Sequence, residues 1–167
     1  MIFDRTDPGA SLDQGGILRD CPVVQVVSLE LEAPDTPDVH SSEERVVVLT
    51  QTCDLAQRKV TQVVVAVAVE AAEIVARGQL NASDIRGPVR AGRVFGWSLL
   101  PADAALAIPE LIVDLRQLHT VPLELLENLC RTGKRDGRIR PLFREHLAKH
   151  FADTYSRIGL PEPYATE

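Results

Sequence analysis

Two valine-rich runs constrain the fold of this chain more than any other feature. Residues 45–50 form a nearly continuous apolar run of strand length, and residues 60–69 form a longer one. Valine favours strands, and a run without polar alternation indicates a strand that is covered on both faces or lies in a barrel core. The nine residues between the runs are polar. We therefore predict two adjacent central strands that are joined by an elaborated turn.

The rest of the chain supplies further strands first and helices last. A helix with apolar residues at helical spacing is expected at residues 70–80, and two more are expected to begin at Pro122 and Pro141, since proline fits the first helical turn. The last of these is predicted to end at Ile158. Shorter strands are expected at residues 15–18, 23–31, 93–100 and 111–115, with loops at 33–44 and 134–137.

This order of elements predicts an α+β protein. A length of 167 residues suits one domain, so we expect residues 1–167 to fold together, with a barrel at 15–121 and C-terminal helices at 122–160. No apolar run approaches the roughly 20 residues of a membrane span. The N-terminus shows no basic start followed by an apolar stretch, so we expect a cytoplasmic protein that does not engage a membrane.

Charge is distributed unevenly along the chain. Residues 1–50 hold ten acidic and three basic side chains, whereas residues 131–144 hold six basic and one acidic. The basic cluster is a candidate surface for RNA or for an acidic protein partner. Its members are Arg131, Lys134, Arg135, Arg138 and Arg140. The alternative is a solvated loop and helix start, and a net charge of −6 with 4% aromatic residues is unfavourable for general nucleic-acid binding.

Cys53 and Asp54 are the first candidates for chemistry, because they follow the first valine-rich run where a strand gives way to a loop. A cysteine nucleophile usually needs a histidine base. Asp54 places negative charge next to the thiol and disfavours a thiolate, so it fits better as the group that orients a histidine. All four histidines are distant in sequence. The alternative role for Cys53 is that of a small buried hydrophobic residue.

His146 and His150 are the second candidates. They stand four residues apart, on one side of the last predicted helix, a spacing that can bind a metal ion with Cys53 or Asp54 as a third ligand. The alternative is a pair of surface histidines. The three cysteines contain no CxxC pair, and no glycine-rich nucleotide loop is present, so we predict neither a resident metal nor a cofactor.

The order of elements resembles the MazF/PemK toxin family, which has an SH3-like barrel. The corresponding segments are residues 15–18, 43–49, 63–67 and 114–121. The resemblance implies a barrel with an inserted helix, and it places Arg45 where the toxins carry an arginine for RNA cleavage. The proline after that arginine is missing here, and the second strand lacks the expected hydroxyl. Residues 50–55 are also similar to a run found in a set of uncharacterised bacterial proteins.

Three hypotheses about function follow. The first is an accessory or degenerate nucleic-acid-related module of a bacterial conflict or toxin–antitoxin system. The second is a cysteine-dependent hydrolase or transferase that uses Cys53. The third is a non-catalytic interaction module, with a homodimer as one form. The candidate catalytic residues across these hypotheses are Arg45, Cys53, Asp54 and His146.

Overall fold

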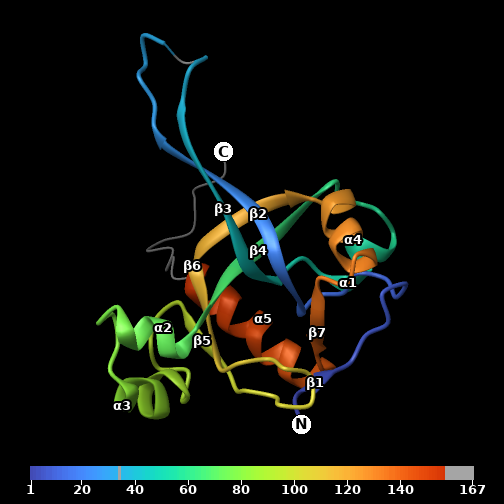
Figure 1. The fold of residues 1–167 in the computed structure, drawn as a ribbon, viewed down its shortest axis with the longest axis vertical. Helices are drawn as coiled ribbons and strands as arrows, with labels where there is room; N and C mark the ends of the chain where they lie inside the picture. Colours follow the sequence, from blue (N-terminus) through green and yellow to red (C-terminus); the bar gives the residue numbers. More distant parts are fainter. Residues whose placement is uncertain (34, 157–167) are drawn as a thin grey trace, which may run out of the picture.

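The computed structural model describes residues 1–33 and 35–156 of the chain. Its strands form one antiparallel sheet in the order β1-β7-β2-β3-β4-β6-β5 (Figure 1). The strands are β1 (Phe3–Asp4), β2 (Gly16–Ser28), β3 (Asp38–Val48), β4 (Gln62–Glu70), β5 (Trp97–Leu100), β6 (Leu111–Pro122) and β7 (Arg135–Ile139). The helices are α1 (Thr52–Ala56), α2 (Ala71–Ala76), α3 (Ala82–Asp84), the π-helical turn η1 (Ile85–Val89), α4 (Leu123–Arg131) and α5 (Pro141–Tyr155). The predicted α+β class is confirmed.

Both faces of the central strands are buried, which explains why their valines do not alternate with polar residues. On one face, Val47 of β3 and Ala66 of β4 pack with Leu147 of α5. On the other face, Val46, Val48 and their neighbours on β4 pack with the apolar side of α4. Each buried valine contributes roughly 1.5–3 kcal/mol relative to an exposed one. The two covering helices therefore account for the continuous apolar runs.

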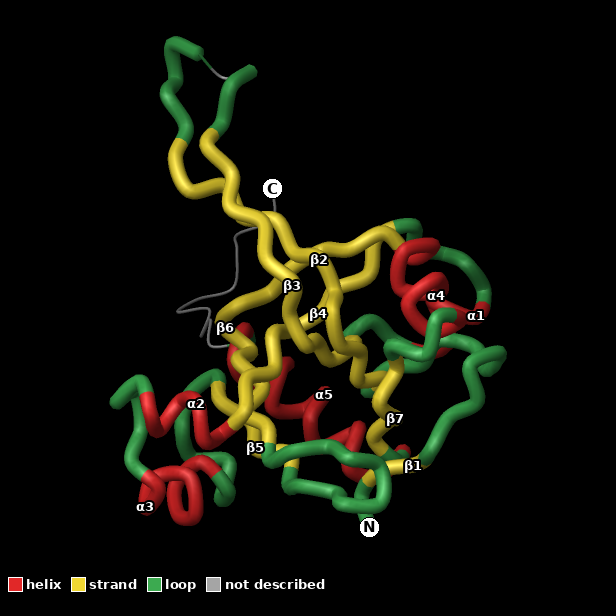
Figure 2. The backbone as a smooth tube through the Cα atoms, viewed as in Figure 1, coloured by secondary structure: helices red, strands yellow, loops and turns green. Residues whose placement is uncertain are grey.

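The hydrogen-bonded sheet is open, where we expected an SH3-like barrel. No ladder joins β1 to β5 within the part of the chain that the structure describes. Instead, the residues beside β5 form a small layer of their own, in which Trp97 and Ile112 pack with Ile74 of α2 and with Ile85 and Val89 of η1. This layer lies beside β5 at the edge of the sheet (Figure 2).

Several boundaries differ from those predicted. Residues 38–44 belong to β3 instead of a loop, and residues 135–139 form β7 instead of a turn. Strand β6 continues to Pro122, whereas β5 begins only at Trp97. The inserted helix is confirmed as α2, and the two helices that follow Pro122 and begin at Pro141 are confirmed as α4 and α5. The predicted end of the last helix at Ile158 lies outside the described residues.

Strands β2 and β3 continue well beyond the body of the protein as a two-stranded hairpin, which we call the arm and define as residues 23–33 and 35–44 (Figure 1). A β-bulge between Leu18 and Cys21 bends β2 at the root of the arm, where Asp20 has a φ of 56°. Bulges of this kind redirect a strand and end its pairing with a neighbour. None of the described helices is long and apolar enough to cross a membrane.

Candidate functional site

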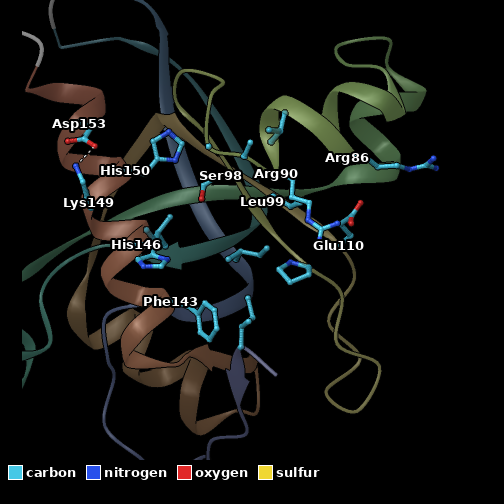
Figure 3. Close-up of a pocket in the computed structure, with 17 residues that line it drawn as sticks. Arg86, Arg90, Ser98, Leu99, Glu110, Phe143, His146, Lys149, His150 and Asp153 are labelled. Carbon is cyan, nitrogen blue, oxygen red and sulfur yellow. Dashed lines mark hydrogen bonds and ion pairs between the residues drawn. The ribbon is translucent and has the colours of Figure 1, made fainter.

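A cavity of about 670 Å³ lies between α5, η1 and β5 (Figure 3). Its floor is mainly apolar and its rim carries charged and polar side chains. The residues that the following argument uses are Arg90, Ser98, Glu110, Phe143, His146 and His150. Binding sites for small molecules are typically concave, apolar and supplied with a few convergent polar groups. We therefore take this cavity, called here the α5 cleft, as the candidate functional site.

Helix α5 supplies one wall of the cleft. Pro141 begins the helix at a position where its missing N–H is not needed, and Leu147 is buried against the sheet. This packing fixes the rotation of the helix and turns His146 and His150 toward β5 (Figure 3). Phe143 lies one turn earlier and contacts the His146 ring edge-on, with 6.4 Å between ring centroids.

The turn η1 and strand β5 supply the opposite wall and the floor. Ile85 and Val89 of η1 are buried against Trp97, and this anchoring places Arg90 at the cleft. In Figure 3, Arg90 lies close to the strand that carries Ser98, whereas Arg86 extends away from the other lining residues. The floor beneath them is formed by Leu99 and Leu100 of β5 and by neighbouring apolar residues.

The charges at the cleft favour an anion. Lys149 forms an ion pair with Asp153 of the same helix, at 2.7 Å between Nζ and Oδ2. By contrast, the Arg90 guanidinium and the two imidazoles have no ion pair or side-chain hydrogen bond among residues 1–33 and 35–156. Among the described residues that line the cleft, Glu110 is the one carboxylate outside the pair with Lys149. Arg90, His146 and His150 therefore present donors that an incoming anionic group can use.

Cys53 and Asp54 lie on α1, outside the α5 cleft. Cys53 is exposed, and its sulfur lies 3.6 Å from Oε1 of Gln51 and 3.8 Å from Oδ1 of Asp54. Within the described residues, the hydrogen-bond contacts of the thiol therefore involve acceptors from its own loop and no histidine. The other two cysteines are buried; desolvation raises the pKa of the Cys21 thiol to about 11 and also raises the pKa of Cys130.

Helix α5 contacts the Cys53 loop through Thr52 instead. Arg144 Nη1 donates to the Thr52 hydroxyl at 3.2 Å, and that hydroxyl also accepts from the backbone N–H of Gln14. His146 faces the cleft on another side of the helix. The structure therefore brings the last helix to the loop, as the sequence hypothesis required, but does not bring His146 to Cys53.

Arg45 lies at the root of the arm and is held by two carboxylates. Its Nε donates to Asp136 at 3.2 Å and its Nη1 donates to Glu70 at 3.3 Å, and its side chain is 21% exposed. It lines a second, smaller cavity of about 320 Å³ together with Trp97 and Arg116. The four candidate catalytic residues thus lie at three separate places.

The basic cluster near the C-terminus is engaged largely within the protein. Lys134 pairs with Asp20, Arg138 with Asp13 and Arg140 with Asp4. The hydrogen bond from Lys134 is the main reason why the pKa of Asp20 is lowered. Arg135 is buried and donates to the backbone carbonyls of Asp7, Ala10 and Ser11. Of the five, only Arg131 is exposed and forms no ion pair within the described residues.

A metal site at the two α5 histidines lacks a third ligand in this structure. No group of three or more His, Cys, Asp or Glu side chains within the described residues is arranged to hold a metal ion. Sequence reasoning identified His146 and His150 but missed Arg90, Ser98 and Glu110. A sequence pattern could have indicated Arg90, because residues 85–102 contain three arginines and no acidic residue to pair with them.

The chain matches no protein-family model and no curated protein sequence.

Proposed function

We propose that the protein is a non-catalytic, nucleic-acid-related module that binds a nucleoside phosphate, either a free nucleotide or the end of an RNA strand, in the α5 cleft. The observation that carries this proposal is the combination of an apolar floor with the unpaired cationic group of Arg90 and the two imidazoles. Phosphate oxygens accept charge-assisted hydrogen bonds from such groups. Phe143 supplies an aromatic face on which a base can stack.

The size of the cleft fits this ligand class. Pockets for small molecules and cofactors span roughly 300–1,000 Å³, and the cleft volume of about 670 Å³ lies within that range. The ligand needs both an apolar body and an anionic group, because the apolar floor and the cationic rim lie side by side. Inorganic phosphate satisfies only the rim and an uncharged nucleoside satisfies only the floor.

Two features support binding over catalysis. Arg45 is occupied by Asp136 and Glu70, so its guanidinium is not available to a phosphodiester. Within the described residues, the Cys53 sulfur has hydrogen-bond contacts to Gln51 and Asp54, and neither is a general base of the kind that activates a thiol. The cysteine-dependent hydrolase and the ribonuclease are therefore weaker alternatives than a binding module.

The relationship to the MazF/PemK barrel, and with it a cytoplasmic role in a bacterial conflict or toxin–antitoxin system, is part of this proposal. It is supported by the antiparallel run β2-β3-β4-β6, whose valine-rich centre corresponds to the segments that carry the resemblance. In this proposal the barrel-like part has lost the cleavage chemistry. Ligand binding has moved to the cleft that α5 builds.

Calorimetric titration with adenosine monophosphate tests the proposal, with adenosine, inorganic phosphate and a short oligouridine as comparison ligands. We expect the nucleotide to bind more tightly than either of its halves. Arg90→Ala and His146→Ala should each weaken binding by about tenfold, which corresponds to ~1.4 kcal/mol. Arg131→Ala is the matched control, because Arg131 is exposed on α4 and remote from the cleft lining.

The oligouridine distinguishes the two sources of the phosphate. Tighter binding of the strand than of the mononucleotide, with the same loss in Arg90→Ala, identifies an RNA end. Tighter binding of the mononucleotide identifies a free nucleotide. Equal binding of adenosine and its phosphate, or binding that is indifferent to Arg90, would contradict the proposal.

A further inference from the structure

The arm presents an unusual apolar face. The pairing register places Val24 opposite Ser41 and Val26 opposite Val39, so all three valines lie on one face of the hairpin. They are 61%, 60% and 51% exposed. The opposite face is polar beyond the root, because Gln25 pairs with His40 there and Val23 pairs with Ser42 only at the buried base.

The tip of the arm adds further exposed apolar side chains. Val27 lies at an irregularity in the register next to Val26, and Leu29 and Leu31 follow in the turn. All three are exposed, and Leu31 is exposed to 85%. Soluble proteins leave single apolar side chains at the surface without consequence, but contiguous apolar patches mark interaction sites. An isolated two-stranded hairpin is also only marginally stable in water, so a partner on this face would stabilise it.

The arm carries the whole net charge of the protein. Its residues include six acidic side chains and no lysine or arginine. They are Glu30, Glu32, Asp35, Asp38, Glu43 and Glu44. Outside the arm the chain has eighteen acidic and eighteen basic residues, which cancel, and the net charge of the chain is −6. Glu43 lies at the base of the arm on the same face as Val24, Val26 and Val39, which we call the valine face. It does so because Val39, Ser41 and Glu43 are alternate residues of β3.

The arm also has free strand edges. Strand β2 pairs with β7 only through residues 16–18, and β3 pairs with β4 only through residues 46–48. Beyond these points, within the described residues, the outer backbone groups of both arm strands have no neighbouring strand. Such an edge is a template to which an extended peptide can add by main-chain hydrogen bonds.

We propose that the arm is the docking site for a basic polypeptide segment with an apolar stripe, bound in an extended conformation. The valine face selects the apolar stripe, the free edges select an extended backbone, and the six carboxylates select positive charge. The same carboxylates repel nucleic acid, and they repel the arm of a second copy of this chain. The partner is therefore a basic protein segment that differs from the arm itself.

Fluorescence anisotropy with the full-length protein tests this proposal. The probe is a labelled short peptide of alternating lysine and valine, and the comparison probes alternate lysine with serine or glutamate with valine. The test variant is the triple substitution Val24→Thr, Val26→Thr and Val39→Thr, since threonine keeps the β-branched shape and strand preference. The control variant substitutes Gln25→Thr and His40→Thr on the opposite face.

We expect the lysine–valine peptide to bind most tightly, and its affinity to fall about tenfold or more in the valine variant. The control variant should bind like the wild type. The lysine–serine peptide should bind weakly, with a strong salt dependence and no response to the threonine substitutions. The glutamate–valine peptide should not bind.

Two results would overturn the proposal. The first is equal binding of the lysine–valine peptide to the wild type and to the valine variant, both folded by circular dichroism. The second is a homodimer that sedimentation detects without peptide and that the valine variant abolishes, because the arm would then dock to a second copy. Neither result bears on the α5 cleft, and the nucleotide titration in turn leaves this proposal unaffected.

Discussion

Arg135 connects strand β7 to the N-terminal segment, and it does so from a buried position. Its guanidinium donates to three backbone carbonyls, at 2.8 Å to Ser11, 3.0 Å to Asp7 and 2.8 Å to Ala10. These carbonyls belong to a stretch without regular secondary structure, and the guanidinium satisfies them together. A planar fork of donors can do this, whereas the single ammonium of lysine reaches fewer acceptors.

Arg135→Ala should therefore lower the free energy of unfolding by about 3 kcal/mol, because three hydrogen bonds from a charged group are lost. Arg135→Lys should recover part of this loss. Urea denaturation measures both effects. The control is Arg131→Ala, an exposed position four residues earlier, which should change the free energy by no more than about 0.5 kcal/mol. Equal effects at the two positions would show that the carbonyl contacts do not stabilise the fold.

At the scale of elements, the arm and the central strands differ in what covers them. Strand β4 has neighbours on both sides and buried residues on both faces, whereas the arm has two free edges and exposed faces. We expect the backbone amides of β4 to exchange with solvent only at an opening free energy close to the free energy of global unfolding. The arm amides should exchange at a far lower opening free energy. Hydrogen exchange read by mass spectrometry measures this difference. Arm amides as protected as those of β4 in the free protein would contradict the assignment of the arm as an uncovered element.

The elements that the sequence predicted well are those whose own residues determine their burial. The apolar runs at residues 45–50 and 60–69 predicted central strands because their side chains require cover on both faces. Pro141 and the spacing of the apolar residues after it predicted α5. Strand β7 was missed because its residues Arg135–Ile139 are mainly charged or glycine. They form a strand only through pairing with β1 and β2, and such distant pairing leaves no local pattern.

The sequence predicted only those residues of the candidate site that share a local pattern, and it missed those that tertiary packing brings together. His146 and His150 were visible as a helical pair, but the opposite wall of the cleft comes from η1 and β5, whose position depends on packing around Trp97. No spacing rule connects these segments. Cys53 was a candidate because of its local context, and that context could not reveal that His146 lines the α5 cleft and does not lie at the thiol.

At the scale of the whole molecule, the uneven charge along the chain has a structural cause. The acidic residues near the N-terminus and the basic residues of β7 and its flanks form ion pairs across the sheet, between Asp4 and Arg140, Asp13 and Arg138, and Asp20 and Lys134. The sequence predicted the clusters but not their mutual neutralisation. Because these pairs cancel within the body, the unpaired negative charge is left on the arm.

This separation of charge predicts how the molecule behaves when the arm is neutralised. Replacing the six arm carboxylates by their amides brings the formal net charge from −6 to zero. It leaves the valines of the arm and the body of the protein unchanged. Proteins without net charge associate more readily, and an exposed apolar strand face is the natural contact. We therefore expect the amide variant to self-associate with rising concentration in sedimentation velocity, while the wild type does not associate through the arm.

Adding Val24→Thr, Val26→Thr and Val39→Thr to the amide variant separates two causes. If the valine face is the contact, the combined variant should sediment as a monomer again, although its net charge is still zero. If loss of net charge alone drives association, the combined variant should associate as much as the amide variant. The second outcome would show that the arm carboxylates keep the whole molecule apart by general repulsion and do not shield its apolar face.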